Sequence, residues 1–183
     1  MAVLIGFLVK NFTLTLMVLG VIAAAISLWR RPRPLTKALV VEDLLAYFIL
    51  FSIGISFFYN FLAHTVYGDM SAQFIGWPQS PFQAELGFAS LGFSVIGFMA
   101  FRGVFSLRVA AIVGPSCFLL GAAGIHVYEM ITRNNFEPGN AGVIFFTDIG
   151  IPIIGFVLLW LKHRWEHESS AAEEVSREGA TAT

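Results

Sequence analysis

The chain alternates between long apolar runs and short polar breaks. A helix needs roughly 20 mostly apolar residues to cross a bilayer, and five stretches reach that length. They are approximately 9–29, 42–65, 81–101, 107–131 and 141–161. The breaks between them are too short to hold a globular domain. The pattern therefore predicts an all-α bundle of about five transmembrane helices over residues 1–163.

The end of the chain has a different character. Residues 164–183, "RWEHESSAAEEVSREGATAT", are polar and contain few large apolar side chains. A segment of this kind buries too little apolar surface to offset the entropy of ordering it. We therefore expect a disordered polar tail after the bundle.

The basic residues near the ends of the five stretches predict an orientation. Cytoplasmic loops of membrane proteins carry the excess of Lys and Arg. One set of loops holds eight such residues, and the other set holds only Lys10 and Arg133. We expect the N-terminus outside, the C-terminal tail in the cytoplasm, and a location in the cytoplasmic (inner) membrane as a multi-pass protein.

Composition supports the same class of protein. Hydrophobic residues make up 57% of the chain and charged residues 13%, and the mean hydropathy is +0.76. A soluble domain this apolar would lack a polar surface, so the lipid bilayer is the expected partner. The net charge of −1 argues against binding to nucleic acid. The single cysteine, Cys117, excludes an intramolecular disulfide.

Five ionisable side chains fall within about two helical turns of the predicted outer surface. They are His64, Glu85, His126, Glu129 and Asp148. Because a charge that faces lipid is costly, all five are expected to point inward and to form one polar pocket. Two imidazoles and three carboxylates would suit a divalent zinc, iron or manganese ion. The same groups could instead exchange protons.

Each of these residues also has a structural interpretation. Glu85 lies at a predicted helix start, where the helix dipole favours a carboxylate. Glu129 could pair with Arg133 one turn later. The two histidines could be satisfied by water or by one backbone carbonyl. Asp148 is the strongest functional candidate, because it lies about two turns deep with no cation one turn away.

Other polar residues are expected at helix ends. Asn140 follows "EPG" and is expected to cap the last span. Glu42 and Asp43 open the second span, where the helix dipole and a salt bridge with the nearby Lys37 would stabilise them. These residues are therefore assigned structural roles.

The third span carries a stripe of small residues, which includes Gly87, Ser90, Ser94 and Gly97. Small side chains let two helix backbones approach closely. The stripe favours packing inside the bundle, with a homodimer contact as the alternative. The second case suggests a membrane-protein partner or homo-oligomer, which would contact the stripe and the outer loop 68–79.

Two motifs carry a resemblance to a known family. They are "SPFQAE", residues 80–85, and "NFEPGNAG", residues 135–142, which is followed by Asp148. Over roughly residues 40–162 the chain resembles a family of small prokaryotic multi-pass membrane proteins with a domain of unknown function. The resemblance implies a membrane protein and no particular activity.

Two functional hypotheses follow. The first is an outward-facing His/carboxylate pocket that binds a divalent metal or exchanges protons, and that acts as a membrane enzyme on a lipid-soluble substrate. The second is an accessory or structural subunit, whose polar residues only lock the packing of its helices. No phosphate-binding loop, dinucleotide fingerprint, Gly-x-Ser-x-Gly or His-Glu-x-x-His motif is present to add a further chemistry.

Overall fold

The computed structural model describes the backbone of residues 2–181 and the side chains of residues 4–165, and every regular element in this part is a helix. The elements are α1 (Ala2–Lys10), α2 (Phe12–Trp29), α3 (Lys37–Phe48), the π-helix η1 (Ile49–Ile55), α4 (Ser56–Thr65), α5 (Gly68–Ile75), α6 (Phe82–Ala100), α7 (Phe105–Arg133), α8 (Pro138–Ala141) and α9 (Val143–Thr181). The predicted all-α fold is confirmed.

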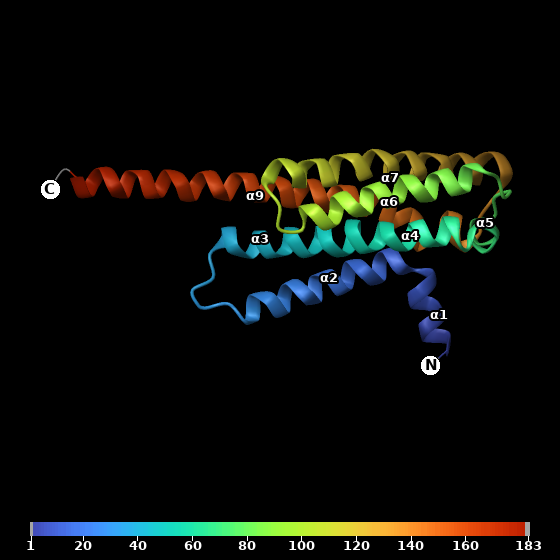
Figure 1. Cartoon of the computed structure of the whole chain (residues 1–183), viewed down its shortest axis with the longest axis horizontal. Helices are drawn as coiled ribbons and strands as arrows, with labels where there is room; N and C mark the ends of the chain where they lie inside the picture. The colour runs from blue at the N-terminus through green and yellow to red at the C-terminus, as the bar shows by residue number, and fades with distance from the viewer. Residues whose placement is uncertain (1, 182–183) are drawn as a thin grey trace.

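Five helical segments of the described chain are long and apolar enough to cross a membrane. They are Phe12–Trp29, Lys37–Thr65, Phe82–Ala100, Phe105–Arg133 and Pro138–Trp165. Each corresponds to one predicted stretch, and they lie side by side as a bundle (Figure 1). The chain is therefore a multi-pass membrane protein by the length and composition of its helices.

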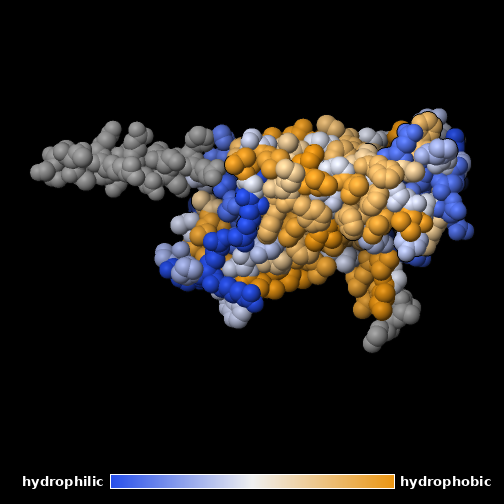
Figure 2. Space-filling view, viewed as in Figure 1, coloured by the Kyte–Doolittle hydropathy of each residue, from blue (hydrophilic) through white to orange (hydrophobic). Residues whose placement is uncertain are grey.

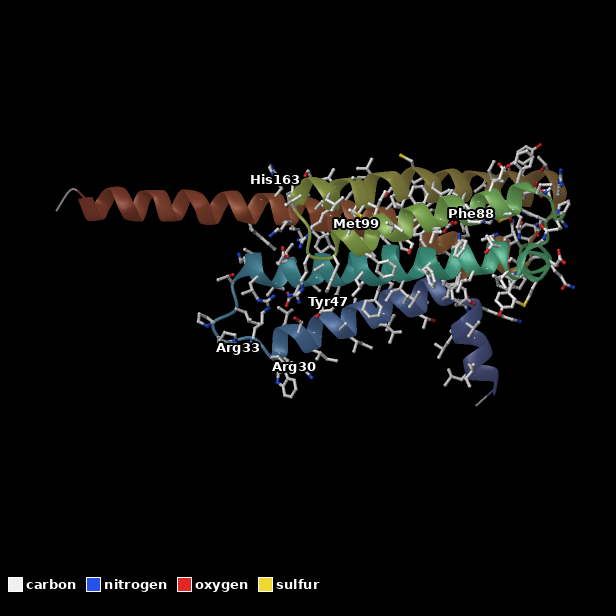
Figure 3. The ribbon with its side chains drawn as sticks, in the orientation of Figure 1. Arg30, Arg33, Tyr47, Phe88, Met99 and His163 are labelled. Carbon is white, nitrogen blue, oxygen red and sulfur yellow. The ribbon has the colours of Figure 1, made fainter. Side chains whose placement is uncertain are left out.

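The surface of the bundle has the polarity expected of a membrane protein. In Figure 2 an apolar band lies between two polar ends. We call the end that carries α5 and α8 the α5 end, and the end at which α3 begins the α3 end. Figure 3 places Arg30 and Arg33 at the α3 end, as it does His163. The direction of the bundle across the membrane stays a prediction.

The second span is the central helix of the bundle. It comprises α3, η1 and α4 and contacts α2, α6, α7 and α9. Leu45, Ile49 and Ile53 on this span are at most 1% exposed and pack in one apolar cluster with Ile112 of α7. This helix is more hidden from lipid than the other spans, which explains why it can carry several polar side chains.

The small-residue stripe of α6 packs inside the bundle. A Cβ atom added at Gly97 would lie 2.5 Å from the backbone nitrogen of Gly54 in η1. Ser94 donates its hydroxyl proton to the Gly54 carbonyl at 2.7 Å, and Asn60 Nδ2 donates to Ser90 Oγ at 3.0 Å. The stripe lets α6 approach the central helix closely, as the first of the two predicted interpretations requires.

Glu42 joins three spans at the α3 end. Its carboxylate accepts two hydrogen bonds from Arg108, at 2.7 and 2.6 Å, and lies 2.6 Å from Lys162 Nζ. The Arg108 residue is only 3% exposed. The expected salt bridge therefore forms with α7 and α9, while the Lys37 ammonium lies 6.0 Å from the centre of the Trp165 ring.

Asp43 ties the central helix to the end of α2. It accepts hydrogen bonds from Arg31 Nε at 2.8 Å and Nη2 at 2.5 Å, and from Ser27 Oγ at 2.9 Å. The hydrogen bond with Asp43 raises the pKa of the Arg31 guanidinium above its ordinary value. Arg31 therefore stays charged, and this end of the bundle is held by ion pairs rather than by apolar contacts alone.

Four features of the chain were not predicted. The first predicted span breaks at Asn11, and α1 turns away from the bundle (Figure 1). The expected outer loop contains the helix α5, and Pro138 opens the short helix α8. The last helix, α9, continues to Thr181. Disorder of the 164–183 tail stays a prediction, since the side chains from residue 166 onward lie outside the described part.

Candidate functional site

A partly open cavity of about 520 Å³ lies in the half of the bundle near the α5 end. Its walls come from η1, α4, α7 and α9, together with α1, α2 and α5. Most of the lining is apolar, but polar side chains interrupt it at His64, His126 and Asp148. Ligand pockets typically have volumes of about 300–1,000 Å³ and a mainly apolar lining with a few polar groups. This cavity has both properties.

Asn140 fixes the proton arrangement of His126. Its side-chain Nδ2 donates to the backbone carbonyls of His126 and Asn135, at 3.2 and 2.9 Å. The amide oxygen therefore faces His126 Nδ1 at 2.7 Å, and it can only accept a hydrogen bond. Nδ1 must carry a proton, and Nε2 of the neutral ring is left as the acceptor.

Asp148 faces this free nitrogen. Its Oδ2 lies 3.6 Å from His126 Nε2, and the two side chains are only 5–6% exposed. The separation is longer than a direct hydrogen bond. A proton on either His126 Nε2 or Asp148 would give a favourable pair, and a small polar group could contact both residues.

A tightly anchored segment brings Trp77 to the same place. The Trp77 ring centroid lies 5.4 Å from that of His126. Asn135 Nδ2 donates to the carbonyls of Ile75 and Gly76, at 3.0 and 3.3 Å. Gly76 has a φ of +78°, a left-handed conformation that glycine adopts without strain. The turn after α5 therefore aims an indole at the cavity wall.

Three buried polar atoms of the described side chains have no hydrogen-bond partner in the protein. They are Ser52 Oγ, His64 Nδ1 and Trp77 Nε1, and all three residues line the cavity. Buried polar atoms are nearly always satisfied, because leaving one unpaired costs about 1–3 kcal/mol. Their common position is therefore evidence that something polar occupies the cavity.

The comparison with known families bears on the same residues. Residues 10–168 match the sequence profile of a family of unknown function, DUF6790. The chain belongs to this family. No curated protein and no solved structure matches the chain. The family match begins at Lys10, so it includes all of the cavity lining except Gly6 and Val9 on α1. The two motifs as markers of the family, and its prokaryotic source, stay predictions.

The structure brings only some of the five predicted pocket residues together. His126 and Asp148 face each other, and His64 lines the same cavity. Glu129 is buried, at 8% exposed, and its carboxylate lies 3.5 Å from Arg133 Nε. This is the ion pair that the structural interpretation of Glu129 expected. Glu85 is exposed and is not part of the lining. Within the described residues, no group of three or more His, Cys, Asp or Glu side chains could hold a metal ion.

Sequence reasoning missed three members of the site. Asn140 was expected as a helix cap, but it is fully buried and bonded to His126, while α9 begins at Val143. Trp77 lies in a segment that was expected to be a loop, and Ser52 lies in an apolar run, so neither was considered as a site residue. Only Asn140 could have been found from the sequence, because it belongs to the motif "NFEPGNAG" that carries the family resemblance. The positions of all three side chains depend on how separate helices pack against one another.

Proposed function

We propose that this protein binds a lipid-soluble molecule in the cavity near its α5 end and exchanges a proton with it through His126 and Asp148. The observation that carries the proposal is the 3.6 Å gap between His126 Nε2 and Asp148 Oδ2 in the wall of a mainly apolar cavity. An apolar chamber selects a lipid-soluble molecule, and the pair supplies a site for one proton.

The proton would move between defined atoms. Asn140 holds the proton on His126 Nδ1, so only Nε2 can gain or lose one. A ligand hydroxyl that contacts Nε2 would give its proton to the ring, and the Asp148 carboxylate would stabilise the imidazolium. The reverse step returns the same proton, so no other reactant is required.

The unpaired polar atoms favour this function over a purely structural subunit. Where polar groups only fasten helices in this bundle, they are paired, as Thr13 and Thr147 are at 2.7 Å. Ser52, His64 and Trp77 have no such partners. A bound molecule would supply them, whereas a role in helix packing gives no reason to bury them around an open space.

The test compares a blocked cavity with a matched control. Ala122 of α7 lines the cavity, whereas Ala89 of α6 is exposed and does not. Full-length protein would be released from lipid nanodiscs in a native mass spectrometer. We expect the wild type and Ala89→Phe to carry a bound small amphiphile from the membrane, and Ala122→Phe to lose it. Equal lipid content in all three proteins would refute binding in the cavity.

Proton exchange needs its own readout. Infrared difference spectra taken while a bound amphiphile is displaced would report the change of a histidine ring between imidazolium and imidazole. We expect such a band in the wild type that is absent from His126→Gln and retained in His163→Gln, which changes a histidine at the α3 end (Figure 3). A band that persists in His126→Gln would show that this residue does not take part.

A further inference from the structure

The cavity opens toward lipid rather than toward water. Its lining includes Val9 of α1 and Met70 of α5, whose exposed fractions are 49% and 62%. Helix α1 is apolar on the sides that face outward, where Leu4 and Phe7 are 61% and 53% exposed. Figure 2 shows this helix as an apolar projection from the bundle. An opening framed by such side chains admits molecules from the bilayer.

The length of the cavity suits one extended chain. Ser52 and His64 both line it, and they are separated by twelve residues of the central helix, which corresponds to about 18 Å. An extended chain advances about 1.2 Å per bond. A linear molecule of about fifteen bonds would therefore reach from one of these residues to the other.

The hydrogen-bonding groups in the wall define the head of the molecule. Trp77 Nε1 is a donor only, so it needs an acceptor. Asp148 forms no hydrogen bond within the described residues, and it faces His126 Nε2, which is an acceptor in the neutral ring. The Asp148 carboxylate and His126 Nε2 therefore both need a hydrogen-bond donor. Ser52 Oγ and His64 Nδ1 can take either role, but they lie about 18 Å apart along the central helix, so one head group cannot bond to both. A single hydroxyl group supplies both a donor and an acceptor.

The charges near the cavity argue against an ionic head. Lys10 is the one lysine or arginine in the described lining, and it lies on exposed α1 rather than beside Asp148. Phosphate and carboxylate groups are normally bound by Arg or Lys with charge-assisted hydrogen bonds. A quaternary ammonium has no acceptor for Trp77 and no donor for His126. An uncharged hydroxyl head therefore matches the hydrogen-bonding groups of the wall better than a phosphate, a carboxylate or a quaternary ammonium does.

We propose that the ligand is a single-chain lipid with an uncharged hydroxyl or phenol head, which enters from the bilayer beside α1. This inference rests on the proposed function, because it names the class of molecule that the same cavity binds. It adds the direction from which the molecule enters and the chemistry of its head. It does not require the proton to move.

The experiment uses four photoreactive probes with the same fifteen-carbon chain and a mid-chain diazirine. Their heads are a primary alcohol, its methyl ether, a carboxylate and a trimethylammonium group. Each probe would be titrated into the full-length protein in nanodiscs, and saturable labelling of cavity-lining peptides would be quantified. We expect the alcohol to half-saturate at a concentration at least about fivefold lower than the other three, because only it matches both a donor and an acceptor.

Conservative variants locate the head. Trp77→Phe removes the indole N–H and should weaken labelling by the alcohol about two- to tenfold, the effect of one hydrogen bond. Glu129→Gln alters a buried residue near the α5 end that does not line the cavity, and it should leave labelling unchanged. Unchanged labelling by the alcohol in Trp77→Phe would refute the assigned position of the head.

The outcomes separate the two proposals. If no probe labels the cavity peptides saturably, the proposed function fails. If the ether, the carboxylate or the ammonium probe labels as tightly as the alcohol, binding in the cavity stands and the inference about the head is overturned. The comparison among probes is made on the wild-type protein, so it does not depend on the folding of any variant.

Discussion

Replacing Gly97 with alanine tests the closest helix contact in the bundle. The added Cβ would lie 2.5 Å from the backbone nitrogen and 2.8 Å from the Cα of Gly54. Ordinary contacts of a Cβ begin at 3.4 Å, so α6 and η1 would have to separate by about 0.9 Å. Backbone atoms cannot swing aside as a side chain can. Overpacking of this kind costs about 1–3 kcal/mol.

The same displacement weakens a neighbouring hydrogen bond. Ser94 donates to the Gly54 carbonyl at 2.7 Å, one turn of α6 from Gly97. Moving the helices apart by this amount stretches the bond to about 3.6 Å, beyond hydrogen-bonding distance, which adds about 0.5–1.5 kcal/mol. We expect Gly97→Ala to lower the free energy of unfolding by about 1.5–4.5 kcal/mol in total.

Gly92 provides the matched control on the same helix. A Cβ added there meets nothing within 4 Å, and alanine is favoured over glycine in a helix by about 1 kcal/mol. Unfolding of both variants by a denaturing detergent in mixed micelles, followed by circular dichroism, gives the comparison. Gly92→Ala should be as stable as the wild type or more so. If both variants unfolded at the same detergent fraction, the close approach of α6 to η1 would be refuted.

Two further predictions use the same unfolding assay. Asn140→Leu removes three hydrogen bonds at His126 and Asn135 and should cost about 3 kcal/mol. Asn11→Ala removes one solvent-exposed hydrogen bond, to the Phe7 carbonyl, and should cost less than about 1 kcal/mol. Equal losses in the two variants would contradict the buried network. Arg108→Leu leaves the Glu42 carboxylate with fewer partners and should lower the free energy of unfolding by about 3 kcal/mol. The double variant Arg108→Leu, Glu42→Leu should recover part of this loss. If the losses of the two single variants simply added, the pairing would be contradicted.

The sequence was sufficient for the spans because the membrane imposes a simple local rule. A helix must satisfy its own backbone and cover about 30 Å with apolar side chains, and both conditions are visible in one stretch of sequence. The predicted boundaries agree with the helices to within a few residues at most ends, as at 81–101 against Phe82–Ala100. Helix α1 was missed, because the polar pair Lys10 and Asn11 was placed at the outer end of the first span and no helix was predicted before residue 9.

The candidate site was only partly predictable. Depth along a helix follows from sequence position, so His126 and Asp148 could be placed at the same level in the membrane. The direction in which a side chain points depends on how each helix is rotated against its neighbours. That rotation leaves Glu85 exposed and places Glu129 beside Arg133, with which it forms an ion pair. The predicted group of five is thereby reduced to a facing pair with His64 in the same cavity.

The sequence by itself determined that this is an all-helical membrane protein with five spans, and that its few buried charges need partners. Only the tertiary structure decided which partners they have. In it Glu42 forms ion pairs with Arg108 and Lys162, and Asn140 forms a hydrogen bond with His126. Among the described side chains, polar atoms of three residues are left unpaired around one cavity. The physical reason is that hydropathy is a property of each residue, whereas a hydrogen bond or a cavity is a property of the distances between helices.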